Sequence, residues 1–175
     1  MSKDILDDFT FINEDIVTTD GVVSSDAYNI FTLANAFLTI DSMTHKKLQK
    51  LCYYAKAWYL ALNDENIIFE NFEAWVHGAV NFDLYQKYRS YGFSLIPMFD
   101  GDVNDIPEEF LSFAREIYEA YGDLSGDDLE KINHQETPWL SARKGLKPWQ
   151  SSDNIISEDE MKIYYRKLMN NEQQN

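Results

Sequence analysis

The amino-acid sequence predicts an all-α fold, a compact single-domain bundle of about six or seven helices that has room for one short β pair. Apolar residues recur at intervals of three and four along most of the 175-residue chain, and cap residues bracket these segments. No long alternation of apolar and polar residues indicates an extended strand. Hydrophobic residues make up 45% of the chain and aromatic residues 15%, which predicts a sizeable core built largely on rings.

The chain divides into an acidic N-terminal arm at residues 1–23, a helical domain at 24–170 and a polar tail at 171–175. We expect the tail to be disordered, because its composition offers nothing to bury. The apolar residues of the arm fall near helical spacing: Ile5, Phe9, Ile12 and Ile16. Two interpretations of the arm stay open, a frayed terminus and an amphipathic helix that docks on a partner.

The first helix of the domain is predicted to follow Ser25, a good N-cap residue, and the second to begin at Thr44. The second helix presents an apolar face made of Leu48, Leu51, Cys52, Ala55, Tyr59 and Leu62. Its lysines are predicted to lie on the side that faces water: Lys46, Lys47, Lys50 and Lys56. Since Cys52 belongs to the apolar face, we expect it to be buried and chemically inert.

The middle of the chain is predicted to hold irregular segments around one helix. Residues 67–69 are apolar and read as extended, and residues 75–80 read as a loop. Asn81 can cap a helix that ends at Gly92. Residues 97–105 read as a further loop.

Start and stop signals bracket the helices of the C-terminal half. The starts are Pro107, Ser125, the pair Thr137 and Pro138, and a capping box at residues 157–160, and the stops are Gly122 and Gly145. These signals predict one long helix, two short helices and a final helix.

The net charge of −15 favours solubility and opposes contact with nucleic acids or anionic membranes. It suits a basic partner. The single cysteine allows no intramolecular disulfide, which fits a cytoplasmic location. No apolar run is long enough to span a bilayer, and the acidic N-terminus does not read as a signal peptide.

The sequence contains no motif that specifies catalysis. The three histidines are far apart in sequence, and the His134-x-Glu136 spacing lacks the cysteine pair of zinc deaminases. The acidic residues at 100–105 resemble the start of a calcium loop, but Asp105 stands where glycine is needed. No phosphate-binding glycine-rich motif is present. No cofactor is therefore expected, and we interpret the protein as a non-enzyme.

Several short motifs together resemble the Panacea domain, also described as the SocA-like or GepA-like domain of bacteria and their phages. The motifs are Thr44-His45-Lys46-Lys47-Leu48-Gln49-Lys50-Leu51, the aromatic positions Tyr54 and Trp58, Ala74-Trp75, Leu84-Tyr85, and His134-Gln135-Glu136-Thr137-Pro138-Trp139. The resemblance covers about residues 27–170. Two departures are visible, since the usual Gly-Pro-Val with a further proline is here Gly78-Ala79-Val80-Asn81-Phe82, and the usual threonine is Asn133.

The resemblance implies an antitoxin that binds and neutralises a small protein toxin encoded by a neighbouring gene. At least one branch of the family acts instead as an adaptor that delivers its toxin to a AAA+ protease, and this alternative stays open. A metal-dependent hydrolase that uses His77 and His134 is the alternative from another class.

The matched positions supply candidate residues for binding a partner or for fixing the shape of the domain. They are Trp75, His77, Gly78, Tyr85, Tyr88, His134, Glu136 and Trp139. Polar residues on loops are the better candidates for recognition. We expect the His77 loop and the His134 turn to meet and to hydrogen-bond one another.

Overall fold

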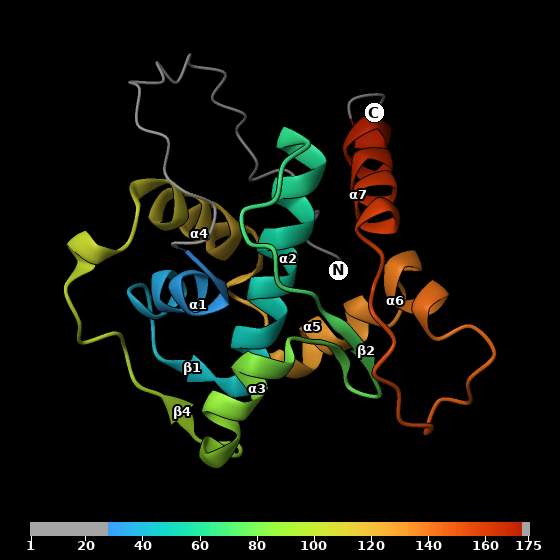
Figure 1. The fold of residues 1–175 in the computed structure, drawn as a ribbon, viewed down its shortest axis with the longest axis horizontal. Coiled ribbons are helices and arrows are strands. Elements are labelled where there is room, and N and C mark those ends of the chain that lie inside the picture. The colour runs from blue at the N-terminus through green and yellow to red at the C-terminus, as the bar shows by residue number, and fades with distance from the viewer. Residues whose placement is uncertain (1–27, 173–175) are drawn as a thin grey trace.

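The computed structural model describes residues 28–172 and shows a bundle arranged around one central helix. Figure 1 shows α2 (His45–Asn63) running through the middle, with α1 (Ile30–Leu38) and α4 (Glu108–Tyr121) on one side and α7 (Glu158–Glu172) on the other. The short helix α5 (Gly126–Asn133) also packs on α2. The predicted all-α class is confirmed.

The remaining elements are short and lie mostly at one end of α2 (Figure 1). They are α3 (Phe82–Tyr88), α6 (Thr137–Ala142), the 3-10 turns Arg89–Tyr91 and Val103–Asp105, and four strands. The strands form two antiparallel pairs, β1 (Met43–Thr44) with β4 (Leu95–Ile96) and β2 (Glu73–Trp75) with β3 (Gly78–Val80).

The β2–β3 hairpin corrects the prediction of a plain loop at residues 75–80. Its three paired positions are too few to produce a readable alternation, which is why the sequence pattern missed it. On its outer side Ile155 forms an isolated bridge with Glu73. Residues 67–69 form no strand in the described chain; Ile67 and Ile68 are buried, and Phe69 is exposed.

Aromatic rings of α2 form the centre of the core. Tyr54 stacks on Tyr121 of α4 with ring centroids 4.4 Å apart, and the indole N–H of Trp58 donates to the Tyr121 hydroxyl at 2.8 Å. Tyr165 of α7 packs edge-on against Trp58 at 5.0 Å. These offset and edge-on pairings add directional contacts to the area that the rings bury, and so fix how α4 and α7 sit on α2.

Two lysines of α2 that were predicted to face water are buried instead. Lys50 and Lys56 are 1% and 0% exposed. The Lys56 ammonium lies 2.6 Å from the Glu158 carboxylate and donates to the Glu70 carbonyl at 2.7 Å. Since α1, α4, α5 and α7 all pack on α2, its central turns have no side left for water.

Most predicted caps are confirmed, with three differences. Thr44, Asn81 and Ser125 each accept a backbone N–H in the first turn of the helix that follows. The first helix, however, is capped by Asn29, and Ser25 lies outside the described residues. Helix α3 ends at Tyr88 and a 3-10 turn leads on to Gly92, while α6 ends at Ala142, before Gly145.

The acidic arm at 1–23 lies outside the described residues, so its two interpretations stay predictions. Helix α7 continues to Glu172, and residues 173–175 lie outside the description. None of the helices described at 28–172 has the length and apolarity needed to span a membrane.

Candidate functional site

Two adjacent pockets border the β2–β3 hairpin and share Trp75 and His77. The first, of about 440 Å³, lies between the hairpin, α3 and the N-terminal ends of α2 and α5. Its lining is Thr44, His45, Lys46, Gln49, Lys50, Trp75, His77, Val80, Tyr85, Gly92, Phe93, Ser125, Gly126 and Asp127. The second, of about 850 Å³, is lined by Glu73, Trp75, Val76, His77, Phe82, Ser151, Ser152 and Asp153. We call these the helix pocket and the hairpin pocket.

Trp75 and Tyr85 form the wall of the helix pocket. Their rings meet edge-on with centroids 4.8 Å apart, and the Trp75 indole N–H donates to the Glu73 carboxylate at 2.6 Å. Tyr85 also lies 5.6 Å from the His45 ring. Burial and the nearby Lys50 lower the pKa of His45 to about 4, so this imidazole is neutral at physiological pH.

His77 and His134 meet at a shared carboxylate. His77 Nδ1 lies 3.0 Å from Glu130 Oε1, and His134 Nε2 lies 3.9 Å from the same oxygen. Lys46 Nζ approaches the other Glu130 oxygen at 2.6 Å. The two segments thus meet beside Glu130, and the hydrogen bond that joins them lies between His134 and the backbone of Val76, the neighbour of His77. Among the described residues His134 Nε2 has no hydrogen-bond partner. Burial lowers the pKa of His134.

Gly78 allows α2, α5 and the hairpin to approach closely. Its φ is +98°, and a Cβ at this position would lie 2.7 Å from Lys50 Cε and 2.8 Å from Asn133 Oδ1. Lys50 Nζ donates to the Ala79 carbonyl at 3.0 Å, and the Ala79 N–H donates to Asn133 Oδ1 at 2.7 Å. A proline at position 79 would lack that N–H. Alanine at position 79 and asparagine at position 133 thus form one hydrogen bond together.

Glu136 holds a buried carboxyl group in the core. It is 4% exposed and accepts hydrogen bonds from Tyr165 at 2.8 Å, Asn133 at 3.1 Å and Tyr54 at 3.3 Å. Burial raises the pKa of Glu136 to about 7, because these three donors only partly replace water around the charged form. All three partners belong to the core, so the side chain joins α2, α5 and α7.

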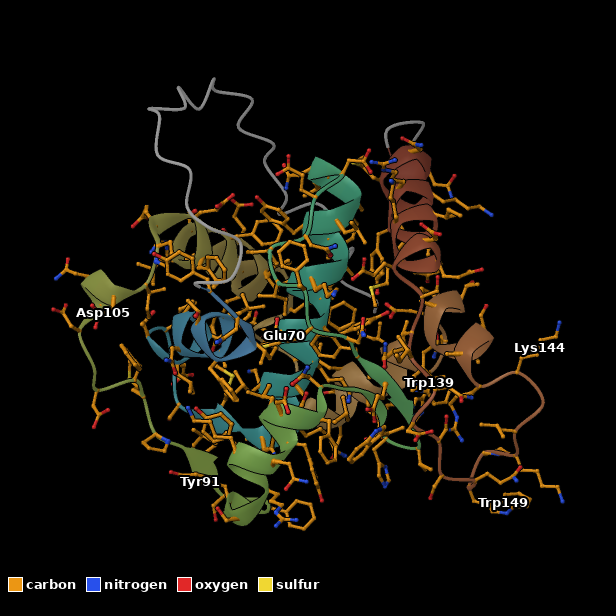
Figure 2. The ribbon with its side chains drawn as sticks, viewed as in Figure 1. Glu70, Tyr91, Asp105, Trp139, Lys144 and Trp149 are labelled. Atoms are coloured by element: carbon orange, nitrogen blue, oxygen red, sulfur yellow. The ribbon has the colours of Figure 1, made fainter. Side chains whose placement is uncertain are left out.

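Trp139 of α6 contacts the hairpin, and Figure 2 shows it inside the molecule. Its indole N–H donates to the Trp75 carbonyl at 3.0 Å. The His134 ring stacks on it with centroids 4.3 Å apart, and the Arg143 guanidinium lies 5.1 Å from the ring centroid. Trp139 is buried, whereas Trp75 keeps part of its surface open.

The structure therefore divides the candidate residues into two groups. Those that line a pocket are Trp75, His77 and Tyr85. Those whose side chains or backbone hold the domain together are Gly78, His134, Glu136 and Trp139. Tyr88 is buried beside His45, with ring centroids 6.3 Å apart, and lines neither pocket.

Sequence reasoning missed four residues of this region: Lys50, Glu130, Asn133 and Arg143. Lys50 lies within the recognised Lys-Leu-Gln-Lys-Leu motif but was predicted to face water, and Asn133 was noted only as a departure from the usual threonine. No sequence motif points to Glu130 or Arg143. Each acts through partners that are distant in sequence, such as Lys46 and Ala74.

A metal centre has no visible basis at residues 28–172. In this part of the chain no three His, Cys, Asp or Glu side chains lie together in a way that could hold a metal ion. His77 and His134 instead share Glu130 with Lys46. His77 and Lys46 contact the Glu130 carboxylate directly, and this group of side chains supplies no ligand set.

Comparison with known proteins adds one match. The sequence model of the family described as antitoxin SocA-like, Panacea domain, matches residues 48–140, more than half of the chain. No curated protein and no solved structure matches. The matched segment contains most of α2, the hairpin, α3, α4, α5 and the start of α6 with Trp139. This chain belongs to the antitoxin SocA-like, Panacea domain family.

Proposed function

We propose that the protein is a cytoplasmic antitoxin that neutralises a small protein toxin by direct contact. Membership of the antitoxin SocA-like family carries this proposal, because the match includes the hairpin and most of both pocket walls. The partner is a toxin encoded by a neighbouring gene. No metal or cofactor enters the proposal.

The geometry supports binding through the open pocket residues. Trp75, Tyr85 and His77 sit on a hairpin and a helix that the buried network holds in place. Side chains fixed in this way lose little conformational entropy when a partner binds. Tryptophan and tyrosine are also the residues that most often dominate binding energy at interfaces.

The polar side chains that most resemble catalytic groups already contact other residues of the fold, which favours binding over catalysis. The Glu136 carboxyl accepts three hydrogen bonds from core residues. His134 is stacked on Trp139, and His77 contacts Glu130. A general base needs a hydrogen-bond path to a substrate proton, and the partners of the Glu136 carboxyl all lie within the core.

A co-expression rescue tests the proposed function. The protein encoded next to the gene for this chain is expressed alone and then together with the chain, in a host that lacks the AAA+ proteases of the adaptor pathway. We expect the neighbour alone to arrest growth and the chain to restore it.

The same assay separates the alternatives. Rescue only when the protease is present would assign the adaptor role instead. A neighbour that is harmless when expressed alone would contradict the proposal, and hydrolase activity of the purified chain would replace it.

A further inference from the structure

Trp149 stands out at the surface as a large ring that the fold leaves uncovered. It is 72% exposed, on the loop between α6 and α7. Figure 2 shows Trp149 at the outer edge of the molecule, whereas Trp139 of the neighbouring helix lies inside. Burying a tryptophan is strongly favourable, so an uncovered one on an ordered loop calls for an explanation.

Arg143 holds this loop in a defined shape. Its guanidinium donates to the carbonyl of Gln150 at 2.6 Å, of Lys147 at 3.3 Å and of Pro148 at 3.5 Å. It also donates to the Ala74 carbonyl of β2 at 2.9 Å, while its own side chain is buried. Arg143 thus bonds both to the carbonyl groups around Trp149 and to strand β2 of the hairpin.

The far end of the loop is fixed as well. The Asn154 carbonyl accepts the Ala74 N–H at 2.8 Å, and the Asn154 amide donates to the Ala142 carbonyl at 2.9 Å. Lys147 Nζ lies 5.4 Å from the centre of the Trp149 ring, which favours one orientation of that ring. The loop therefore loses little conformational entropy when a partner binds through Trp149.

The same loop forms one wall of the hairpin pocket, two residues beyond Trp149. The loop contributes Ser151, Ser152 and Asp153, and the hairpin contributes Trp75 and Glu73. Two carboxylates, Glu73 and Asp153, face this pocket of about 850 Å³, and its lining contains no lysine or arginine. Within residues 28–172 neither carboxylate has a salt-bridge partner, although Glu73 accepts the Trp75 indole N–H.

We propose that Trp149 and the hairpin pocket form one contact face for a basic segment of the toxin. A lysine or arginine of the toxin enters the pocket between Glu73 and Asp153 and lies against the Trp75 ring, and an apolar recess of the toxin closes over Trp149. The chain's net charge of −15 attracts a basic partner to the chain, and the two pocket carboxylates then select this face. This inference rests on the proposed function and adds the face and the chemistry of the partner.

The position of the loop bears on partner choice. The family match ends at residue 140, before Arg143 and Trp149, while the hairpin lies inside it. The proposed face therefore joins a segment typical of the family to one that is outside the match. This chain's selectivity for its own toxin is assigned to the second segment.

Binding of the purified neighbour-encoded protein to the full chain tests the proposal. Trp149→Ala should raise the dissociation constant about 30-fold or more, as the loss of an interface hot spot does. Because the ring is already exposed, the substitution should leave unfolding unchanged, which a thermal melt verifies. Phe69→Ala removes another exposed ring, one that lines neither pocket, and should leave binding unchanged.

The charges of the pocket are tested with a double substitution, Glu73→Gln with Asp153→Asn. We expect binding to weaken about tenfold and to lose much of its dependence on salt. Asp100→Asn with Asp105→Asn removes the same charge from two exposed aspartates that line neither pocket, and should change binding little. Figure 2 shows Asp105 on the opposite side of the molecule from Trp149.

The outcomes separate this inference from the function on which it rests. If the unchanged chain binds and rescues while Trp149→Ala and the pocket variant bind equally well, the face is wrong and the antitoxin function stands. If the unchanged chain does not bind the neighbour-encoded protein, both proposals fall.

Discussion

Burial determines the chemistry of the ionisable side chains at the centre of this molecule. Burial lowers the pKa of Lys50 to about 7 and raises that of Glu136 to about 7, so both groups are partly neutral near physiological pH. Each has hydrogen-bond partners from the fold, Ala79 for Lys50 and three side chains for Glu136. Perturbed pKa values also mark active sites, but here the partners indicate a structural network.

Replacing Glu136 with glutamine should remove a pH dependence of stability. The pKa of Glu136 rises from an ordinary 4.5 to about 7 in the folded chain, so the folded state holds this proton more tightly than the unfolded state. Stability of the wild type therefore falls as the pH rises from about 4.5 to about 7. Glutamine keeps the acceptor oxygen and has no proton to lose.

Urea unfolding near pH 5 and near pH 7.5 measures this effect. Between the two conditions Glu136→Gln should gain about 1–3 kcal/mol relative to the wild type. His45 titrates in the same range with its pKa lowered to about 4, but it is present in both proteins and cancels in the difference. Parallel pH profiles for the two proteins would show that the Glu136 carboxyl is not perturbed by the fold.

The buried lysines show what sequence reading cannot recover at the residue scale. Helical periodicity indicates which residues share a face of α2, and it identified the apolar face correctly. It does not say how many helices pack around the other faces. The prediction that Lys50 and Lys56 face water assumed that only one side of α2 is buried, and both lysines are buried in the structure.

At the scale of elements, local signals were sufficient for most helices. Thr44, Asn81 and Ser125 cap their helices as predicted, because a side-chain oxygen can serve the first turn without help from the rest of the fold. The β2–β3 hairpin depends on distant partners, namely Asn133, Trp139 and Arg143. That dependence explains why its residues read as a loop.

Gly78→Ala should disrupt the hairpin and its contacts with α2 and α5. The added Cβ would meet Lys50 and Asn133 at less than 3.0 Å, and the backbone has a φ of +98°. We expect a loss of about 2–4 kcal/mol in the free energy of unfolding, from strain and overpacking together.

Gly145→Ala is the matched control for this substitution. Gly145 has a similar φ of +86°, but a Cβ there would meet nothing within 4 Å. It should cost about 1 kcal/mol, from the backbone alone. Equal losses for the two variants, measured by chemical denaturation, would mean that the close approach at Gly78 contributes nothing.

For the whole molecule, the fold class and the family could be predicted from sequence, and the proposed binding face could not. The motifs from Thr44 to Trp139 lie largely within the match at 48–140, so they identify the family. The Trp149 loop has no motif, and its shape depends on hydrogen bonds from the buried Arg143 and from Asn154. Which exposed aromatic residue lies on a firmly held loop becomes visible only when those bonds are known.

The central claim is that this chain neutralises its toxin by direct contact, and a purified system tests it most directly. The chain and the neighbour-encoded protein are mixed without protease or ATP, and complex formation and the toxin's activity are followed together. We predict a stable complex whose affinity falls as salt rises, and full inhibition once the chain saturates the toxin. A toxin that stays active while saturated with the chain would contradict the account.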